Sequence, residues 1–449
     1  MDIYFDLLLH SIGFALIFRT RIPNQIVNFV LIIFYILSTI QLLIVGYKWQ
    51  YVPLYVIIFI ITTMHFFNME SKYKITKVVY YFLMFLIIGI SATLVYILPI
   101  PKFEIENKQY SVGYEEFHIV VSDREQPKAF YELSNLTAES NRELLVDVYY
   151  PSNDKTEASQ LFKDVDTNWG KTVIKYLNRT WGITLPEFLL SHLNLSYLDI
   201  GTNLERLDIK SPVVIYTHGW SGEKIFATDQ LITIASQGYV VVAIDHTGLA
   251  MFTELPTGTI YNTGSTENSS KVYDVMYEMS LDIENTINYL ENKNYHADFS
   301  DISLIGHSTG GGSAHLYCSR NDCNSLILQD PFFVPLLEEV GTIDLVTDSY
   351  FFYSEDWYNN GYEDINDLNE IEVYRSYVKN KNFAQGFYMT QSAHYDFIAF
   401  GAISPLAKYT FLKGRIDYKD SLKANNRFNL ESLASKKITT DNIVYEIEK

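Results

Sequence analysis

The stretch Ile302-Ser303-Leu304-Ile305-Gly306-His307-Ser308-Thr309-Gly310 decides the fold class of this 449-residue chain. Its last five residues form a G-x-S-x-G pentapeptide, which follows an apolar strand candidate and precedes a glycine-rich helix candidate. A sharp strand-to-helix turn of this kind holds the serine in a strained conformation with its hydroxyl exposed. Glycines flank the serine because side chains there would clash with the neighbouring strand and helix. The setting predicts a catalytic serine at Ser308; the alternative is an ordinary glycine-rich βα turn.

A catalytic serine needs a histidine that takes its proton and an acid that orients the histidine. In a strand–serine–helix setting the chain order is serine, then Asp or Glu, then histidine. Only two histidines follow Ser308, and His315 lies two turns along the predicted helix, pointing away from the serine. His394 follows the last predicted strand. We therefore assign His394 as the general base.

The acid has more than one candidate. Asp330 ends the predicted strand after the serine motif, and Glu355 and Asp356 end the next strand. Both strand ends lie at the carboxyl edge of a parallel sheet, where ligands bind. Position alone does not choose between them.

An oxyanion hole needs two backbone N–H groups aimed at the developing negative charge. We expect one donor from Thr309, the residue after the serine, and the second from Trp220 in the loop His218-Gly219-Trp220. His218 itself is expected to be structural. The two cysteines, Cys318 and Cys323, do not make a zinc site, and we expect no metal or cofactor.

Strand and helix candidates alternate along residues 101–449, which predicts an α/β fold with a mostly parallel sheet. The helix candidate Lys271–Asn292 carries apolar residues at spacings of three and four, which is typical of a helix packed on a sheet. Two regions depart from the alternation: an insertion at 155–210 with two helical pieces, 173–177 and 185–190, and a polar loop at 250–270. Either region is a candidate lid. The strand candidates are Glu116–Ser122, Glu143–Tyr150, Val213–Thr217, Tyr239–Asp245, Ile302–Ile305, Ser325–Gln329, Ser349–Tyr353 and Phe383–Thr390.

Residues 1–100 predict a separate transmembrane module of about four helices. Two of its four apolar runs, Gln25–Gly46 and Val78–Leu98, reach the roughly 20 residues that cross a bilayer. The other two, Ile3–Phe18 and Pro53–Phe67, are shorter. The positively charged loops after the first and third runs are expected in the cytoplasm. With four crossings, the module is a multi-pass anchor in the plasma membrane and residues 101–449 lie outside the cytoplasm; with three they lie inside.

Charge and cysteine content limit the partners. Residues 1–100 carry +3 and the whole chain −19, so residues 101–449 carry −22. An acidic surface of this size argues against nucleic-acid binding. Cys318 and Cys323 are close enough in sequence for a disulfide, which would suit an oxidising exterior; the alternative is two free thiols. The expected partner is a lipid or small ester, and the oligomeric state stays open.

Across about residues 110–405 the sequence resembles the plasma-type platelet-activating factor acetylhydrolases and their dienelactone-hydrolase-like bacterial relatives. The resemblance implies an α/β-hydrolase fold, with Ser308 as nucleophile, His394 as base and the Trp220 and Thr309 amides as oxyanion donors. It favours Asp330 as the acid, and relatives also carry a cysteine pair where Cys318 and Cys323 lie. The matching stretches are 146–151, 190–193, 217–219, 238–246, 305–311 and 353–355.

Motifs and resemblance together predict a membrane-anchored serine esterase. The resemblance implies carboxylic esters as substrates, with short or oxidised acyl chains on phospholipid-like molecules. Two alternatives remain: an acyltransferase that uses the same triad, and a catalytically inactive membrane scaffold.

Overall fold

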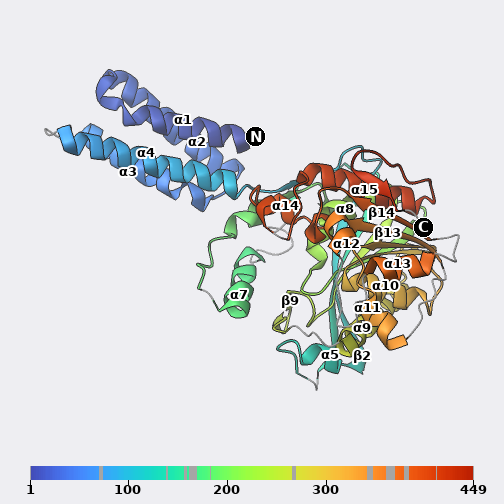
Figure 1. The fold of residues 1–449 in the computed structure, drawn as a ribbon. Coiled ribbons are helices and arrows are strands. Elements are labelled where there is room, and N and C mark those ends of the chain that lie inside the picture. The colour runs from blue at the N-terminus through green and yellow to red at the C-terminus, as the bar shows by residue number, and fades with distance from the viewer. Residues whose placement is uncertain are drawn as a thin grey trace.

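The computed structural model describes residues 2–69, 74–137, 140–155, 159–160, 169–182, 184–264, 269–340, 347–360, 370–378, 384–410 and 412–447. Within these residues the chain forms a helical bundle, residues 2–97, and an α/β part, residues 101–447 (Figure 1). A short linker at residues 98–101 joins the end of the bundle to the first strand of the α/β part.

A mixed sheet lies at the centre of the α/β part. Across the described residues it has ten strands, in the order β15-β14-β13-β12-β11-β7-β8-β3-β2-β6. The run from β8 to β14 is parallel throughout, while β2, β3 and β15 pair antiparallel at the two ends. The expected mostly parallel sheet is confirmed. Its strands are β2 (Ser111–Glu125), β3 (Asn141–Ser152), β6 (Gly201–Thr202), β7 (Pro212–Thr217), β8 (Val240–Asp245), β11 (Asp298–His307), β12 (Ser325–Gln329), β13 (Asp348–Ser354), β14 (Ala384–Met389) and β15 (Val444–Glu446).

Helices cover both faces of the sheet, and each face has its own apolar core. On β7, Val213 and Ile215 pack into one core and Val214 and Tyr216 into the other, because successive side chains of a strand point to opposite faces. Figure 1 shows α9, α10 and α11 on one side of the sheet and α8 and α15 on the other. The helices are α5 (Lys128–Tyr131), α7 (Trp169–Trp181), α8 (Thr228–Ala235), α9 (Ser269–Asn292), α10 (Thr309–Cys318), α11 (Val334–Val340), α12 (Glu355–Asn360), α13 (Glu370–Val378), α14 (Phe400–Ile403) and α15 (Tyr418–Leu433).

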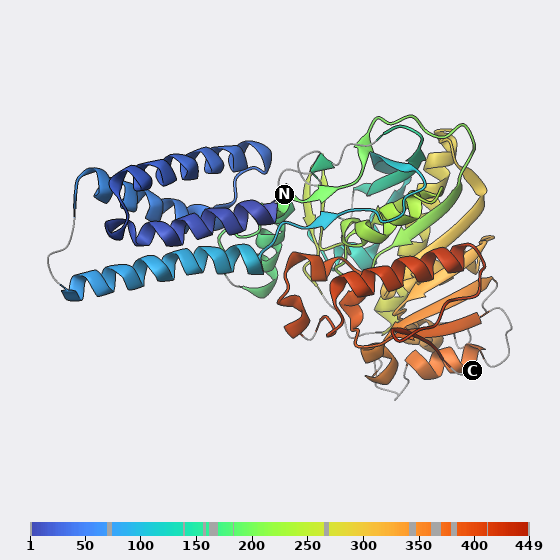
Figure 2. The ribbon, with the colours of Figure 1, turned by 90° about the horizontal axis from the view of Figure 1, so that it is seen from above.

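Four antiparallel helices form the bundle: α1 (Asp2–Ile17), α2 (Asn24–Ile44), α3 (Val52–Phe66) and α4 (Lys74–Ile97) (Figure 2). Three segments are long and apolar enough to cross a membrane: 24–44, 49–66 and 77–97. The third apolar run of the sequence reaches spanning length because the turn Trp49–Tyr51 extends its helix. Helix α1 is shorter than these three segments.

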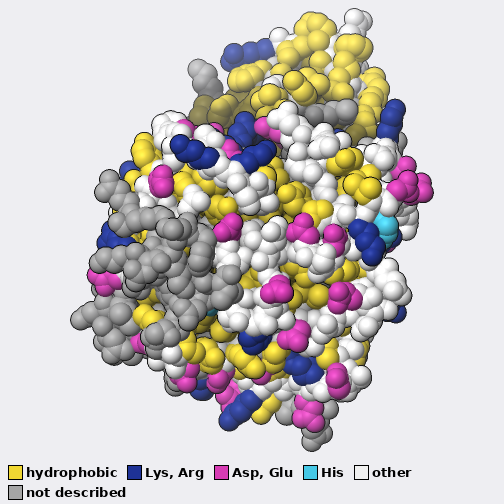
Figure 3. Space-filling model, turned by 90° about the vertical axis from the view of Figure 1, so that its right-hand side faces the viewer, with side chains coloured by type: hydrophobic (Ala, Val, Ile, Leu, Met, Phe, Trp, Pro, Cys, Tyr) yellow, Lys and Arg dark blue, Asp and Glu magenta, His cyan; other side chains and the backbone are white. Residues whose placement is uncertain are grey.

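The outer surface of the bundle is apolar. Phe29, Leu43 and Phe82 are 63, 82 and 64% exposed, while Leu9 and Ile58 are buried between the helices. In the space-filling view hydrophobic side chains gather at the upper end, where the bundle lies, and acidic side chains are spread over the α/β part (Figure 3). Contiguous apolar surfaces of this extent mark membrane or protein contacts.

The bundle contacts the α/β part through two segments far apart in sequence. The Trp49 indole N–H donates to the carbonyl of Leu189 (3.2 Å), and its ring meets Phe188 edge-on at 5.2 Å. The Ser404 hydroxyl donates to the carbonyl of Ile97, at the end of α4 (2.6 Å). The predicted insertion and the segment after His394 thus both reach the bundle.

Several local expectations change. The piece 173–177 lies in helix α7 as predicted, but the expected helical piece 185–190 is absent and residues 187–190 form a turn. The backbone N–H and carbonyl of Leu185 bond to the Asn178 side chain (2.7 and 3.0 Å), which holds this segment against α7. The expected loop 250–270 contains a hairpin of β9 (Phe252–Leu255) and β10 (Gly258–Tyr261). A small separate sheet joins β1 (Lys102–Phe103), β4 (Ser159–Gln160) and β5 (Tyr197–Leu198). Phe383 and, within the insertion, residues 156–158, 161–168 and 183 lie outside the described residues.

Cys318 and Cys323 form a disulfide, with their Cα atoms 5.6 Å apart. It closes the short turn between α10 and β12. Of the two possibilities that the sequence left open, the structure has the bonded one.

Candidate active site

Ser308 lies between β11 and α10, in a backbone conformation that only a tight turn imposes. Its φ is 57° and its ψ is −125°, a strained region for a residue with a side chain. A Cβ on Gly310 would lie 2.2 Å from the carbonyl oxygen of Thr217, so no larger residue fits there. The backbone N–H of Ser308 donates to the carbonyl of Gln329 (3.0 Å), which ties the turn to the end of β12. The elbow expected from the pentapeptide is present.

His394 and Asp330 are brought together at the carboxyl edge of the sheet. The Nδ1 of His394 lies 3.1 Å from Oδ2 of Asp330. Because a carboxylate only accepts, Nδ1 carries the proton, and the lone pair of Nε2 is left to act as a base. The pairing is the one that a serine hydrolase uses to orient its histidine.

Two rings enclose His394. The His307 ring centroid lies 4.5 Å from it, and the Trp357 ring stacks on it at 4.6 Å. His307 also donates from Nε2 to the backbone carbonyl of His394 (3.1 Å), which fixes the loop beside the elbow. Burial lowers the pKa of His394 to about 4, against a smaller opposing effect of Asp356. The imidazole is therefore neutral near pH 7, as a general base must be.

Asp330 is fully buried and held on both carboxylate oxygens. The backbone N–H of Ser354 donates to Oδ1 (2.6 Å) and the Ser354 hydroxyl to Oδ2 (2.7 Å). Burial raises the pKa of Asp330 to about 7, although these two hydrogen bonds oppose the rise. A φ of 41° turns the residue back toward the site. When His394 takes up a proton, the ionised carboxylate of Asp330 stabilises the resulting positive charge.

The other two acid candidates lie elsewhere. Glu355 accepts from the backbone N–H of Gln391 (2.6 Å), and Asp356 accepts from the Asn360 side chain (2.8 Å). Asp330 is the candidate bonded to His394. Among the described residues no hydrogen bond joins the Ser308 hydroxyl to His394, which is common when no substrate is bound.

The two predicted oxyanion donors belong to Thr309, the first residue of α10, and to Trp220, which follows Gly219 in the loop after β7. A Cβ on Gly219 would lie 2.7 Å from Cβ of Ser308, so only glycine lets this loop come so close. In the part of the chain that the structure describes, no carbonyl accepts from the backbone N–H of Trp220 or Thr309. His218 is buried and donates from Nδ1 to the carbonyl of Gly219 (2.7 Å), the structural role expected for it.

A buried network behind the oxyanion loop was not predicted. The Thr217 hydroxyl lies 2.8 Å from Nε2 of His246, whose Nδ1 lies 2.9 Å from Asp282. Arg142 and Arg124 both donate to the same carboxylate. Burial alone would raise the pKa of Asp282, but the two guanidinium groups outweigh it and hold the pKa well below its ordinary value. The network ties α9 to the strand that leads into the oxyanion loop.

Sequence reasoning also missed His307, Trp357 and Ser354 as neighbours of the triad candidates. His307 is the variable residue inside the pentapeptide, so its position was visible but its contact with His394 was not. Ser354 ends β13, where attention to hydroxyl residues at the carboxyl edge would have found it. Trp357 lies in α12, and no local pattern shows that it reaches His394.

Three similarities to known proteins bear on this site. The family model "Platelet-activating factor acetylhydrolase, isoform II" matches residues 106–288, which include the oxyanion loop but end before Ser308. A platelet-activating factor acetylhydrolase of Cavia porcellus is 21% identical over 334 residues, covering 66% of this chain and 72% of that protein. The ferulic acid esterase of Streptomyces cinnamoneus shares the fold, with a TM-score of 0.59 and 17% identity, over 78% of this chain and 99% of the esterase. The resemblance expected from the motifs is thereby confirmed: the chain is similar to the platelet-activating factor acetylhydrolases, and it shares an α/β-hydrolase-like fold with the ferulic acid esterase.

Proposed function

We propose that this protein is a membrane-anchored serine hydrolase with Ser308 as nucleophile, His394 as general base and Asp330 as the orienting acid. The observation that carries the proposal is the strained elbow at Ser308 beside the Asp330–His394 pair. Strain of this kind persists only where the surrounding structure enforces it, and it gathers at functional sites.

The reaction follows from these positions. The Ser308 hydroxyl attacks the ester carbonyl while Nε2 of His394 takes its proton, and Asp330 stabilises the imidazolium. The backbone N–H groups of Trp220 and Thr309 stabilise the oxyanion of the tetrahedral intermediate. The alcohol leaves with the proton from His394, and water then hydrolyses the acyl-enzyme by the same steps.

The helical bundle is proposed as a multi-pass anchor, a domain separate from the hydrolase. Its support is the exposed apolar surface and the three segments of spanning length. An enzyme fixed to the bilayer meets lipid esters at high local concentration. The similarity to platelet-activating factor acetylhydrolases therefore favours phospholipid-like substrates with short or oxidised acyl chains.

The insertion at 155–210 is proposed as a wall over the substrate site. The Trp169 indole N–H donates to Glu223, just past the oxyanion loop (2.8 Å), and the Thr172 hydroxyl donates to Glu254 in the hairpin (2.8 Å). Phe188, on the same insertion, contacts Trp49 of the bundle. The insertion thus links the bundle to the neighbourhood of Ser308.

The α/β part is proposed to lie outside the cytoplasm, at the plasma membrane. The disulfide between Cys318 and Cys323 supports this side, because disulfides persist in oxidising compartments. The basic residues Arg19 and Arg21 lie at the far end of the bundle, where the positive-inside rule favours the cytoplasm.

Labelling with a fluorophosphonate probe tests the nucleophile. The full chain in membranes should be labelled, and Ser308→Ala should lose both labelling and ester hydrolysis, since removing a catalytic serine costs about 10⁶-fold in kcat. Ser319→Ala, which changes an exposed serine at the end of α10, is the matched control and should keep both. Equal labelling of the Ser308→Ala and wild-type proteins would refute the assignment.

A series of esters with increasing acyl length then tests the substrate class. Short-chain phospholipid esters should give a higher kcat/KM than long-chain ones. A preference for long, unoxidised chains would overturn the proposed acyl range while leaving the triad intact.

A further inference from the structure

Three buried amide side chains meet on the side of the sheet that α8 and α15 cover. They are Gln230 of α8, Gln329 at the end of β12 and Asn429 of α15, and none is more than 1% exposed. The Nε2 of Gln329 donates to Oε1 of Gln230 (2.9 Å) and to Oδ1 of Asn429 (3.2 Å). The Nδ2 of Asn429 donates to the same Oε1 of Gln230 (2.8 Å). These bonds close a ring of three side chains, which we call the amide triangle.

Gln329 connects the amide triangle to the proposed nucleophile and to the proposed acid. It directly precedes Asp330 in the chain, and its backbone carbonyl accepts from the N–H of Ser308 (3.0 Å). The side chain of one residue in the triangle is therefore anchored in the core, while its backbone holds the elbow and leads into the acid. The position of Gln329 affects both catalytic groups.

Two amides also hold the turn that carries the proposed base. The Nε2 of Gln230 donates to the carbonyl of Phe397, three residues after His394. Asn425 of α15 is 2% exposed, and its Nδ2 donates to the carbonyl of Asp396 (2.8 Å). Both carbonyls belong to the short helical turn that begins at His394. The amides thus bond this turn to α8 and α15.

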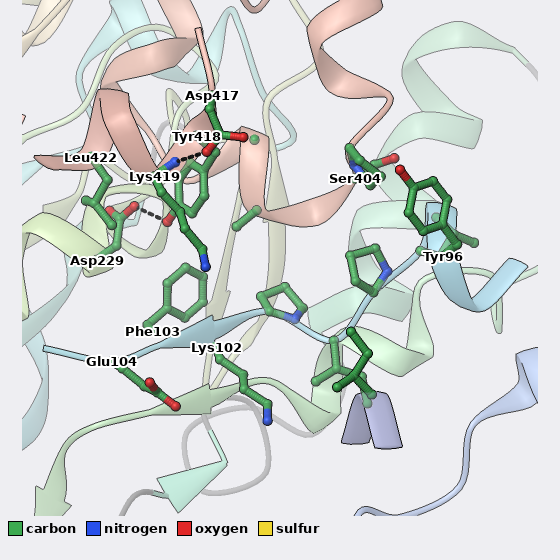
Figure 4. A pocket seen from close by; sticks show the side chains of 18 of the residues that line it. Tyr96, Lys102, Phe103, Glu104, Asp229, Ser404, Asp417, Tyr418, Lys419 and Leu422 are labelled. Atoms are coloured by element: carbon green, nitrogen blue, oxygen red, sulfur yellow. Dashed lines mark hydrogen bonds between the residues drawn. The ribbon is translucent and has the colours of Figure 1, made fainter. Parts of the chain in front are cut away.

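The two helices are in turn bonded to each other. The Tyr418 hydroxyl, at the start of α15, donates to the carboxylate of Asp229, the residue before Gln230. Figure 4 shows this pair in the wall of the cavity that lies between the bundle and the α/β part. Farther along, the Asn426 amide donates to the Thr233 hydroxyl (3.3 Å). Because α8 and α15 are joined in this way, they form a common support for the amides.

Two acceptors in this network lack partners. Within the described residues, neither Oδ1 of Asn425 nor Oε1 of Gln329 accepts a hydrogen bond, although both side chains are buried. An unpaired buried acceptor destabilises the folded state, and an apolar side chain of the same shape would avoid this cost. Side chains that lower stability persist where function requires them.

The turn of the base is held on both sides of the histidine. Before it, the N–H of Asp356 donates to the carbonyl of Ser392 (3.1 Å), and at the histidine itself His307 donates to the carbonyl of His394. After it, the bonds come from the amides. Misplacement of a catalytic group by about 1 Å can lower the rate about 100-fold. The bonds after the histidine are therefore expected to matter for the rate.

We infer that four buried amides are positioning residues, which fix the proposed base relative to Ser308. They are Gln230, Gln329, Asn425 and Asn429. The inference rests on the proposed function, and it assigns these residues no contact with substrate. They act through the backbone that they hold: the turn after His394 on one side and the end of β12 on the other. Their loss should lower kcat and leave KM nearly unchanged.

An apolar substitution of similar size tests the bond from α15. Asn425→Leu removes the donor to the Asp396 carbonyl, and the full chain in detergent should show a kcat about tenfold lower, with KM within about threefold of the wild type. It should melt close to the wild-type temperature, because it also removes an unpaired acceptor. Asn426→Leu is the matched control, since it loses a bond to Thr233 but none to the turn of the base, and it should keep its kcat.

A second pair tests the bond from α8. Gln230→Met removes the donor to the Phe397 carbonyl and opens the amide triangle, so kcat and the rate of fluorophosphonate labelling should both fall about tenfold or more. Gln237→Met, just after the end of α8, loses an equivalent bond to the carbonyl of Asn107 (3.1 Å) and should keep both rates. If Gln230→Met does not fold, Asn425→Leu decides the test.

Two results would overturn the inference. One is that Asn425→Leu and Gln230→Met keep kcat within about threefold of their controls, or change KM alone. The other is that each control loses as much kcat as its partner variant, because general packing would then explain the loss.

Ser308→Ala, assayed alongside, separates this inference from the proposed function. An inactive Ser308→Ala beside fully active amide variants would overturn the positioning role alone. A Ser308→Ala protein as active as the wild type would instead overturn the proposed catalytic function.

Discussion

The Asp330–His394 pair holds the histidine in the tautomer that leaves Nε2 free, and this predicts the effect of a single amide substitution. Asp330→Asn should lower kcat about 10⁴-fold, as replacement of the triad acid does in serine proteases, because the ring is then held in the wrong tautomer. Asp356→Asn is the control, since Asp356 bonds to Asn360 and not to His394, and it should stay within a few-fold of wild type. Ester hydrolysis by the two purified variants decides the matter; the reverse order of effects would make Asp356 the acid.

The surroundings of His394 also predict a pH profile. The base must be neutral and the acid ionised, so kcat/KM should decline as pH drops through the raised pKa of Asp330, about 7, and fall further through the lowered pKa of His394, about 4. Trp357→Ala removes the ring stacked on His394 and lets water reach the imidazole. The pKa of His394 should therefore move up toward 6.5, and the lower limb of the pH profile should move up with it. A profile of kcat/KM against pH from 3 to about 9 would show this; a limb that stays in place or moves down would contradict it.

Individual site residues differ in how far the sequence could reach them. Ser308 and His394 follow from a motif and from chain order, because few histidines come after the serine. Asp330 and Asp356 end neighbouring strands, and which carboxylate meets the ring depends on how each loop turns; Asp330 does so with a φ of 41°. Trp357 reaches His394 only through the packing of α12, which no local pattern reveals.

At the level of elements, α9 is fixed to the sheet by more than its apolar stripe. The Asp282 carboxylate accepts from Arg142, which is completely buried. Asp282→Ala would leave a buried guanidinium uncompensated, and breaking such a pair costs about 3–5 kcal/mol in the free energy of unfolding. Glu291→Ala, on the exposed end of the same helix, should change it by less than about 0.5 kcal/mol. Thermal or denaturant unfolding of the detergent-solubilised chain would measure both; equal effects would mean that the network adds nothing to stability.

Among the elements, those with strong periodicity were predictable and those made by long-range pairing were not. The predicted strand 325–329 and the helix near 271–292 have nearly the observed bounds because continuous apolar runs and a 3.6-residue stripe define them locally. The β9–β10 hairpin lies in a glycine- and threonine-rich stretch where composition hides the pairing. β15 is recruited to the sheet edge by β14, from more than fifty residues away.

For the whole molecule, the bundle and the disulfide lead to one arrangement across the membrane. The start of α1 and the end of α4 both lie at the end of the bundle that faces the α/β part, and Arg21 lies at the far end. With the α/β part outside, Lys437→Cys should react in intact cells with a maleimide that cannot cross membranes, and Arg21→Cys should react only after the cells are opened. Both positions are exposed, and the two native cysteines are bonded to each other, so each variant carries one reactive thiol. The wild-type protein, without a free thiol, is the blank.

Labelling of Arg21→Cys but not of Lys437→Cys in intact cells would place the hydrolase in the cytoplasm and would remove the oxidising compartment that the disulfide requires. Labelling of both would mean that the bundle does not cross the bilayer, and the exposed apolar faces of α2 and α4 would then need a protein partner to cover them.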